Sequence, residues 1–417
     1  MSGKGERRSA HDSRLTTVPA TVKGLGLVSF FNDLASEMVY PLLPAFVTGV
    51  LGGGAMALGA LDGAADLTAA ALKWVSGRLS DRKGWQKPLI IAGYGTAVLV
   101  RPLIAVANAA WQVIGFRVLD RIGKGLRSPA RDALVAQVTS PEARGRAFGF
   151  HRAMDHLGAV AGSLLAWWLL QGDADVRDVI GWSWVPGVAV VLVLVAVLRG
   201  AEGRRGGQTA ATGGPADGRR GGQTATTGGR ADGRTGSDVA GRAFWVPVFL
   251  LVLLTVGRLP EMLLLLRLQE LGIAVAMVPL VWAALHVVRS AAAYPGGWLS
   301  DWLGARRMLS LGGLLFAGVC LWLAQALGPT AAAAVFLLLG LVSGLTEAAE
   351  RALVAVLAPV KTGRGFGTVQ GLAGVAALPA GLGFGLLYQQ TGAPAALIAS
   401  GTVVGVAGLL LAAGGRR

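Results

Sequence analysis

The sequence predicts an all-α membrane protein in which twelve transmembrane helices form two parallel six-helix repeats. Three observations support this prediction. Of the 417 residues, 53% are hydrophobic and only 15% are charged, which is too apolar for a surface in contact with water. The apolar residues form twelve long segments, and short motifs recur at one spacing in the two parts of the chain. The chain is therefore expected to lie in a lipid bilayer.

Each predicted helix is an apolar segment long enough to cross the membrane. About 20 apolar residues are needed to span roughly 30 Å of hydrocarbon. The predicted spans are 22–46, 55–76, 87–107, 110–133, 147–171, 180–199, 243–267, 275–298, 308–327, 330–357, 364–388 and 394–413. The tails at 1–21 and 414–417 lie outside them. Residues 1–23 lack the apolar core and cleavage site of a secretory signal peptide, so the first span is expected to insert uncleaved.

The basic residues predict the orientation of these spans. A formal net charge of +15 first suggests a nucleic-acid partner, but Lys and Arg gather on alternate connections, as the positive-inside rule requires. The alternate connections near 47–54, 105–110, 328–330 and 389–394 carry no Lys or Arg. Both termini are therefore expected in the cytoplasm, and no nucleic-acid partner is expected. Arg outnumbers Lys, and Gly and Ala are abundant, as is typical of GC-rich bacteria, so a bacterial cytoplasmic membrane is the predicted location.

A repeated motif indicates that the chain arose by duplication. Gly77-Arg-Leu-Ser-Asp-Arg-Lys-Gly84 recurs in weaker form as Gly297-Trp-Leu-Ser-Asp-Trp-Leu-Gly304, and 297 − 77 gives a displacement of 220 residues. Two further pairs of segments, 133–136 with 352–355 and 146–149 with 364–367, are displaced by 219 and 218 residues. Parallel repeats of six helices are typical of one large class of secondary transporters.

A basic, Gly-rich segment at 200–242 separates the two repeats, which are predicted at 22–199 and 243–413. Gly203-Arg-Arg-Gly-Gly-Gln-Thr-Ala recurs 15 residues later from Gly218, as in low-complexity linkers. This segment has too few apolar residues to form a core, so it is expected to be a disordered cytoplasmic linker. The alternative, binding of RNA or anionic lipid, is less favoured because no aromatic residues are present for stacking.

These motifs resemble those of the major facilitator superfamily. The segment 77–84 closely fits the family's signature between helices 2 and 3, and Arg121-Ile-Gly-Lys-Gly125 fits the helix 4 signature, with Lys124 in place of a polar amide. Further segments, 32–44 and 131–152, resemble a prokaryotic, efflux-like branch of the family. The resemblance implies the family's twelve-helix fold and links Arg121 to proton coupling. In helix 5, Gly162 is followed by Ser163 where drug–proton antiporters carry proline, which weakens the prediction of antiport.

Ionisable residues within the first two predicted helices are candidates for coupling or substrate binding. Each costs about 2.5–3.5 kcal/mol in a membrane on insertion scales, so such residues usually face a cavity or a partner. Asp33 and Glu37 share one face of helix 1, and Asp62 and Asp66 share a face of helix 2 with Lys73. The alternative is that Lys73 reaches the cytoplasmic interface and the acids only pair with Arg on helix 4.

Helix 4 has a basic face, and helix 5 carries one deep carboxylate. Arg117, Asp120, Arg121 and Lys124 are spaced to share one side of helix 4. The acids of helices 1 and 2, together with Asp155 of helix 5, are the expected counter-charges. A static network of salt bridges is the alternative to a proton path. His151, four residues before Asp155, lies close to the basic loop and is interpreted as incidental to a proton relay.

The second repeat contains fewer intramembrane charges. These are Arg258, Glu261, His286, Arg289, Glu347, Glu350 and Arg351. Coupling is therefore expected mainly in the first repeat, with the second providing a more apolar wall for the substrate. Trp282 and the Leu-rich segment 263–266 suit such a wall, although Leu residues in membrane helices more often face lipid.

The duplicated motif itself is predicted to form a conformational latch on the cytoplasmic side. A glycine permits close helix approach in membranes, and Asp81 is able to accept hydrogen bonds at a helix amino end. The residues assigned to this latch are Gly77, Asp81, Arg82, Gly84, Arg127, Arg131, Gly297 and Asp301. Family resemblance places the start of helix 11, near 363–367, against Gly77. A tight turn whose charges only set topology is the alternative.

Taken together, the sequence predicts an alternating-access secondary transporter, most favourably a proton-coupled exporter of a small organic molecule. A proton-coupled importer and a non-transporting membrane receptor or scaffold are the alternatives. No P-loop for ATP is present, so an ATP-driven pump is not expected. No enzymatic activity and no cofactor are expected. Cys320 is the only cysteine, which excludes an intrachain disulfide and a multi-cysteine metal site. The expected partners are the substrate, protons and lipid, with the protein acting as a monomer.

Overall fold

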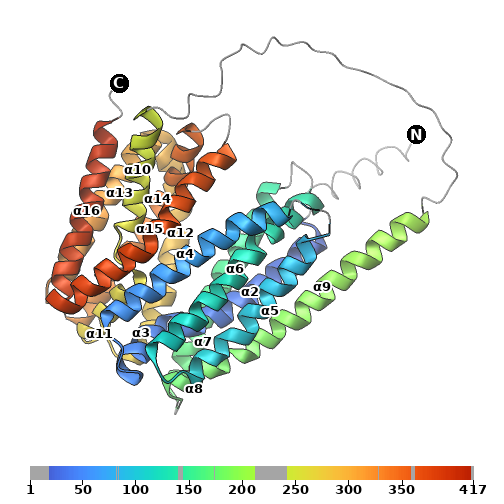
Figure 1. Ribbon diagram of the computed structural model, residues 1–417, viewed down its shortest axis with the longest axis horizontal. Coiled ribbons are helices and arrows are strands. Elements are labelled where there is room, and N and C mark those ends of the chain that lie inside the picture. Colours follow the sequence, from blue (N-terminus) through green and yellow to red (C-terminus); the bar gives the residue numbers. More distant parts are fainter. Residues whose placement is uncertain are drawn as a thin grey trace, which may run out of the picture.

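A computed structural model gives the fold of the chain. It describes residues 18–80, 82, 84–139, 144–172, 174–211, 242–326, 328–357 and 362–414. Every regular element in this described part is helical, which confirms the all-α prediction. Figure 1 shows these helices as two groups that meet at one end of the molecule and diverge toward the other, where α9 ends and α10 begins.

The first group runs from α2 to α9. Its elements are α2 (Ala20–Val39), η1 (Tyr40–Leu42), α3 (Leu43–Ala45), η2 (Phe46–Val50), α4 (Ala55–Ser80), α5 (Gln86–Leu103), η3 (Ile104–Val106), α6 (Ala110–Val138), α7 (Arg144–Leu170), α8 (Val176–Trp182) and α9 (Trp184–Ala211). Within it, α2 packs on α7 and α9, while α6 packs on α4 and α5. The first predicted span, 22–46, is not one regular helix, because Pro41 and Pro44 each lack a backbone N–H.

The second group runs from α10 to α16. Its elements are α10 (Arg242–Val256), α11 (Glu261–Glu270), η5 (Val275–Met277), α12 (Val278–Leu303), α13 (Ala305–Leu323), α14 (Pro329–Leu357), α15 (Thr362–Thr391) and α16 (Ala393–Ala413). Here α12 packs on α14, and α13 packs on α14 and α16. Of the predicted linker, 200–211 forms the last part of α9, and 212–241 lies outside the described residues.

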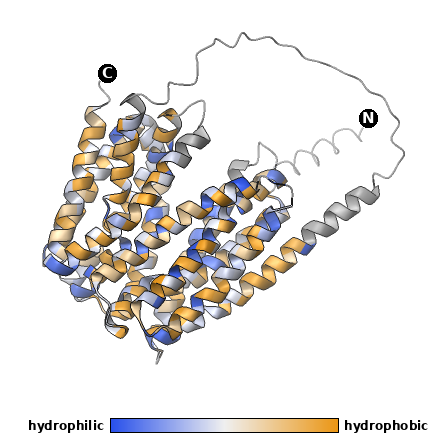
Figure 2. Cartoon of the chain, viewed as in Figure 1, coloured by the Kyte–Doolittle hydropathy of each residue, from blue (hydrophilic) through white to orange (hydrophobic). Residues whose placement is uncertain are grey.

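Ten helical segments in the described part are long and apolar enough to cross a membrane. The predicted spans 22–46 and 110–133 are not among them. The first falls on α2, which carries Lys23, Asp33 and Glu37, and the second falls on α6, which carries the basic face. Figure 2 shows hydrophobic residues along most helices and hydrophilic ones along α6. The two most polar predicted spans are therefore those that bring charge into the middle of the molecule.

The helix predicted at 243–267 is broken between α10 and α11. Pro260 has no N–H and disfavours helical backbone at the residue before it, so the chain leaves the helix at 257–260. Ser400 of α16 satisfies the backbone groups that the break frees. Its Oγ accepts from the Leu259 N–H at 2.8 Å and donates to the Gly257 carbonyl at 2.7 Å. The break leaves the amino end of α11 inside the molecule.

Small residues bring the two groups of helices together along α4 and α15. A Cβ atom added to Gly63 would lie 2.7 Å from the Ala377 carbonyl oxygen, and one on Gly385 would lie 2.7 Å from Met56 Cα. Gly59 and Gly381 face each other even more closely. Glycine is needed here because only a residue without a side chain lets the two backbones touch. The groups also meet where α7 packs on α12 and where α11 contacts α3 and α4.

The Gly381→Ala variant is expected to weaken this contact. Its new methyl group would overlap the Gly59 carbonyl, so the free energy of unfolding should fall by about 1–3 kcal/mol, the usual cost of overpacking. Thermal unfolding in one detergent would measure the change. Gly383→Ala is the matched control on the same helix, because nothing lies within 4 Å of its added Cβ. Equal unfolding temperatures for the two variants would contradict the proposed close contact.

Candidate functional site

A cavity of about 630 Å³ lies between the two groups of helices. Its volume is in the range of sites that hold drug-sized molecules. The first group lines it with side chains of α2, α4 and α6, and the second with residues of α10 to α12, α14 and α15 and of the break at 257–260. The ionisable residues in its wall are Glu37, Asp62, Asp66, Lys73, Arg121, Lys124, Arg258, Glu261, His286, Arg289 and Glu350.

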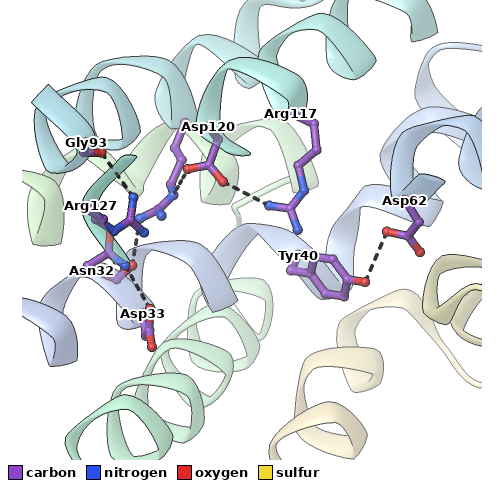
Figure 3. Close-up of polar contacts among 9 residues, drawn as sticks. Asn32, Asp33, Tyr40, Asp62, Gly93, Arg117, Asp120 and Arg127 are labelled. Carbon is purple, nitrogen blue, oxygen red and sulfur yellow. Dashed lines mark hydrogen bonds and ion pairs between the residues drawn. The ribbon is translucent and has the colours of Figure 1, made fainter. Parts of the chain in front are cut away.

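The cavity is closed at the end where η1, α4 and α11 meet, here called the outer end. Tyr40 lies between two carboxylates, with its hydroxyl 3.3 Å from Asp62 Oδ1 and 3.3 Å from Glu261 Oε2 (Figure 3 shows Tyr40 and Asp62). Asp62 Oδ2 accepts the Met262 N–H at 3.0 Å, so this carboxylate binds the amino end of α11. A carboxylate is favoured at that position by the helix dipole. These contacts join the first group of helices to the second.

A second contact across the cavity involves Glu37. Its Oε2 accepts a hydrogen bond of 2.8 Å from the indole Nε1 of Trp282 and lies 4.0 Å from Nε2 of His286. The Trp282 ring also packs against Tyr40, with 5.3 Å between ring centroids. Trp282 is only 3% exposed. It therefore forms part of the cavity wall, and it also fixes a carboxylate of the opposite group of helices.

At the other end the cavity reaches toward the linker side of the molecule. Its lining includes Lys73 of α4 and Gln370 of α15, both near the ends of those helices that adjoin the basic connections. The polar contacts of Tyr40 and Glu37 lie at the opposite end. The end toward the linker side, where the two groups of helices diverge in Figure 1, is here called the inner end.

The predicted site residues fall into two sets. Glu37, Asp62, Asp66 and Arg121 line the cavity. Arg117 and Asp120 are buried beside it, at 2% and 1% exposed. Asp33 and Asp155 are not part of the lining: Asp33 Oδ1 accepts from Asn32 Nδ2 at 2.8 Å, and Asp155 Oδ1 lies 3.4 Å from Nδ1 of His151. The structure thus brings four of the eight predicted residues to the cavity wall.

The buried carboxylate of α6, Asp120, has a partner that the sequence reasoning missed. Arg101 of α5 contacts Asp120 Oδ1 through its Nε at 3.0 Å and donates from Nη1 to the Asn32 carbonyl at 2.7 Å. Arg117 approaches Asp120 Oδ2 at 3.6 Å, and its guanidinium carbon lies 4.8 Å from the centre of the Tyr40 ring. A lone Arg within the apolar span 87–107 was the available signal, since such a charge requires a partner.

The expected counter-charges of helix 4 are therefore wrong in part. Within the described residues, no ion pair joins Arg117, Arg121 or Lys124 to the acids of α2, α4 or α7. Asp33, Glu37 and Asp62 are held instead by hydrogen bonds from Asn32, Tyr40, Trp282 and the backbone of α11, while Asp155 faces His151. That histidine is 4% exposed, so it is a buried partner of Asp155 rather than an interfacial residue.

The second group of helices is more polar at the cavity than the sequence indicated. Arg258, Glu261, His286, Arg289 and Glu350 all line it, so the charge is shared between both groups. The helix break explains part of the difference, because it turns Arg258 and Glu261 into the cavity. The leucines of 263–265 are buried in the protein core, at 4% exposed or less, rather than facing lipid.

The predicted latch is not assembled in this structure. Nothing lies within 4 Å of a Cβ atom added to Gly77 or Gly84, and one on Gly297 meets only Ala348 at 3.9 Å. Arg82 is exposed. Arg127 donates to the Gly93 carbonyl at 3.1 Å, and Arg131 donates to Ser29 Oγ at 3.1 Å. Asp81 and the side chain of Asp301 lie outside the described residues. The latch remains a prediction for a state closed at the inner end.

Comparisons with known proteins agree with this architecture. The sequence matches the Major Facilitator Superfamily over residues 25–266. An uncharacterized MFS-type transporter of Methanocaldococcus jannaschii is 35% identical over 142 residues, which are 34% of this chain and 35% of that protein. The multidrug resistance protein MdtH of Photorhabdus laumondii is 35% identical over 136 residues, 33% of this chain and 34% of that protein. The chain thus matches less than half the length of these curated relatives.

Solved structures are similar over nearly the whole chain. A POT family transporter in complex with 5-aminolevulinic acid superposes with a TM-score of 0.73 at 12% identity, covering 95% of this chain and 96% of that one. The nucleoside transporter NupG gives a TM-score of 0.69 at 10% identity, covering 96% of this chain and 100% of that one. At such low identity the likeness concerns the fold alone.

Replacement of Arg101 by Met is expected to destabilise the protein strongly. The substitution leaves Asp120 buried with only the longer contact to Arg117, and removing one partner of a buried ion pair costs about 3–5 kcal/mol. Arg152→Met is the matched control, because its ion pair with Glu347 is 53% exposed on the arginine side and should contribute less than about 1 kcal/mol. Thermal unfolding would compare them, and similar losses in both variants would contradict a structural role for Arg101.

Proposed function

The chain belongs to the major facilitator superfamily, and from this premise we propose that it is a proton-coupled exporter of a small organic molecule that works by alternating access. Membership of the family and the transporters among its relatives indicate a multi-pass membrane transporter rather than an enzyme. The proposed location is a bacterial cytoplasmic membrane, with both termini and the linker 200–242 in the cytoplasm. The two functional units are the six-helix repeats 22–199 and 243–413, within a monomer.

The observation that carries the proposal is the polar closure of the cavity at its outer end. Tyr40, Asp62, Glu261 and the amino end of α11 join the two repeats there. An alternating-access transporter must break such contacts when its halves rock, and must form others at the inner end. The segment around Gly77 and Asp81, free of close contacts at Gly77 in this state, is proposed to form the inner closure.

The arrangement around Tyr40 supports coupling to protons. Its hydroxyl has one hydrogen, so it is able to donate to only one of the two carboxylates at a time. The other carboxylate, also 3.3 Å from the phenol oxygen, needs a proton of its own to form a hydrogen bond there. Two ionised carboxylates at one site would repel each other. The closed outer end is therefore favoured when Asp62 or Glu261 holds one proton.

Export is proposed over import because relatives of this chain include multidrug resistance proteins. A proton-coupled importer would use the same outer closure but would move its substrate inward. A receptor or scaffold would keep its activity when the cavity charges are neutralised. Asp33, Arg117, Asp120 and Asp155 are proposed to act indirectly, by holding α2, α6 and α7 in place around the cavity, since the structure places them outside its lining.

Proton-coupled transport predicts that substrate and proton fluxes depend on each other. In proteoliposomes that contain the pH dye pyranine, a transported compound from a panel of metabolites and antibiotics should trigger proton movement and should itself accumulate with an imposed pH gradient. Asp62→Asn, which keeps an oxygen acceptor for the Met262 N–H, should reduce this coupling at least tenfold. Substrate movement that ignores the gradient in the wild type would sink the proton-coupling proposal, and unchanged coupling in the variant would exclude Asp62.

The outer closure also predicts a pH-dependent distance between the two repeats. Spin labels at Val50→Cys and Thr391→Cys, in a Cys320→Ser background, report on the outer end, because both sites are exposed near it. Raising the pH ionises both carboxylates, so the population of long distances should grow. Asp62→Asn should abolish this response. Glu270→Gln, a carboxylate on the same helix as Glu261 but paired with Arg267, should retain it.

A distance distribution that stays the same from acid to alkaline pH in the wild type would contradict the role of this site. A pH response that persists fully in Asp62→Asn and is lost in Glu270→Gln would place the proton elsewhere on the outer surface.

A further inference from the structure

Three cations without partners share one wall of the cavity. Arg121 and Lys124 are three residues apart on α6, and Lys73 lies on α4, which packs against α6. The packing is close, because a Cβ atom added to Gly125 would lie 3.3 Å from the Ala69 carbonyl oxygen. Within the described residues, none of the three charged groups has a hydrogen bond or ion pair to another residue. Here these three residues are called the basic wall.

Other intramembrane cations of the same repeat do have partners. Arg101 and Arg117 bind Asp120, Arg127 donates to the Gly93 carbonyl, and Arg131 binds Ser29 and Asp132. Intramembrane charges are costly and are normally paired or exposed to a water-filled cavity. The basic wall meets that requirement only through the cavity. Its cations are thus the ones available to a ligand.

The carboxylates of the cavity do not balance this wall. Glu37, Asp62 and Glu261 accept hydrogen bonds at the outer end. On the basic wall, Asp66 is the one carboxylate among the described residues without such a bond. The opposite wall contains Arg258, Arg289 and Glu350, and Arg289 lies 3.9 Å from Glu347. The inner part of the cavity therefore carries an excess of positive charge.

We infer that the transported molecule is an organic anion whose carboxylate or phosphate group binds Lys73, Arg121 and Lys124. This inference rests on the proposed transport function and names its substrate class. Guanidinium and ammonium groups are the usual protein ligands of carboxylate and phosphate. Trp282, Leu285 and Val369 offer apolar surface for the rest of the molecule, and the volume of about 630 Å³ accommodates a body the size of one or two rings.

An anionic substrate is also consistent with export. An inside-negative membrane potential drives protons inward and anions outward, because it acts on the sign of the charge. An exchanger that moves a proton in and an organic anion out is therefore driven by the potential in both of its half-reactions.

Matched probes that differ in charge test the inference. The full chain in lipid nanodiscs would be titrated with 2-naphthoate, 2-naphthyl phosphate and 2-naphthylmethylammonium, which share one ring system. Binding would be followed by calorimetry and by the shift in unfolding temperature. The two anions should bind saturably and raise the unfolding temperature, while the cation should bind at least about tenfold more weakly, since charged hydrogen bonds are lost and repulsion takes their place.

Single substitutions then locate the site. Lys73→Gln and Lys124→Gln should each lower the affinity for the two anions by about tenfold. Lys124→Glu should lower it further, because this substitution reverses the charge. Both Gln variants should also raise the unfolding temperature of the ligand-free protein, since each removes an unpaired cation next to Arg121. Arg78→Gln is the control on α4: its guanidinium stacks on the exposed Trp74, outside the cavity, so anion binding should not change.

The inference is overturned if the cationic probe binds as tightly as the anions or if neither anion binds the wild-type protein. It is also overturned if the Lys73→Gln and Lys124→Gln variants bind the anions with wild-type affinity. These outcomes are separate from those of the transport experiment. Anion binding without a response to a pH gradient would refute proton coupling alone, and gradient-driven transport of cations would refute the anion inference alone.

Discussion

The cost of placing charge inside a membrane determines much of this structure. An ionisable group there needs a partner or a water-filled cavity, and α6 carries five such groups within its central part, from Arg117 to Arg127. Asp120 pairs with Arg101 of α5 and with Arg117, and Arg127 donates to the Gly93 carbonyl of α5. Arg121 and Lys124 have only the cavity. The charged residues of α6 thus fall into two sets, those that pair with other residues and those that line the cavity.

The surroundings of the break between α10 and α11 reflect a similar cost, that of leaving backbone N–H and C=O groups unpaired inside the membrane. Pro260 frees N–H and C=O groups at membrane depth, where no lipid group is able to bind them. Ser400 satisfies two, and Asp62 of the other repeat binds the amino end of α11. The closure of the outer end is thus the means by which a broken helix satisfies its backbone. Opening that end exposes the Met262 N–H, so water must replace Asp62 there.

The sequence predicted the all-α fold and most of the helices, because hydrophobic length is a local signal. Helical periodicity also placed Glu37, Asp62, Asp66 and Arg121 on charged faces of their helices, and these four residues line the cavity. It did not predict which charges pair. Arg101 and Asp120 lie on different helices, and periodicity says nothing about the contacts between helices. The role of Glu261 was missed for a related reason. The break before α11 and the packing of α11 against α4 together bring Glu261 close to Tyr40 and Asp62, and neither is a local signal in the sequence.

The remaining question is how the outer closure and the basic wall act together, and α4 supplies the physical link. Asp62, Asp66 and Lys73 all line the cavity from this one helix, and eleven residues at 1.5 Å each place Lys73 about 16 Å from Asp62 along the axis. The glycines at 59 and 63 pack α4 backbone to backbone on α15 of the other repeat. In the proposed transport cycle, a rotation of α4 that withdraws Asp62 from the amino end of α11 also moves Lys73 relative to α15 at the inner end. In this proposed cycle, protonation at one end of α4 and ligand binding at the other bias a single movement, which is the requirement for coupling the two fluxes.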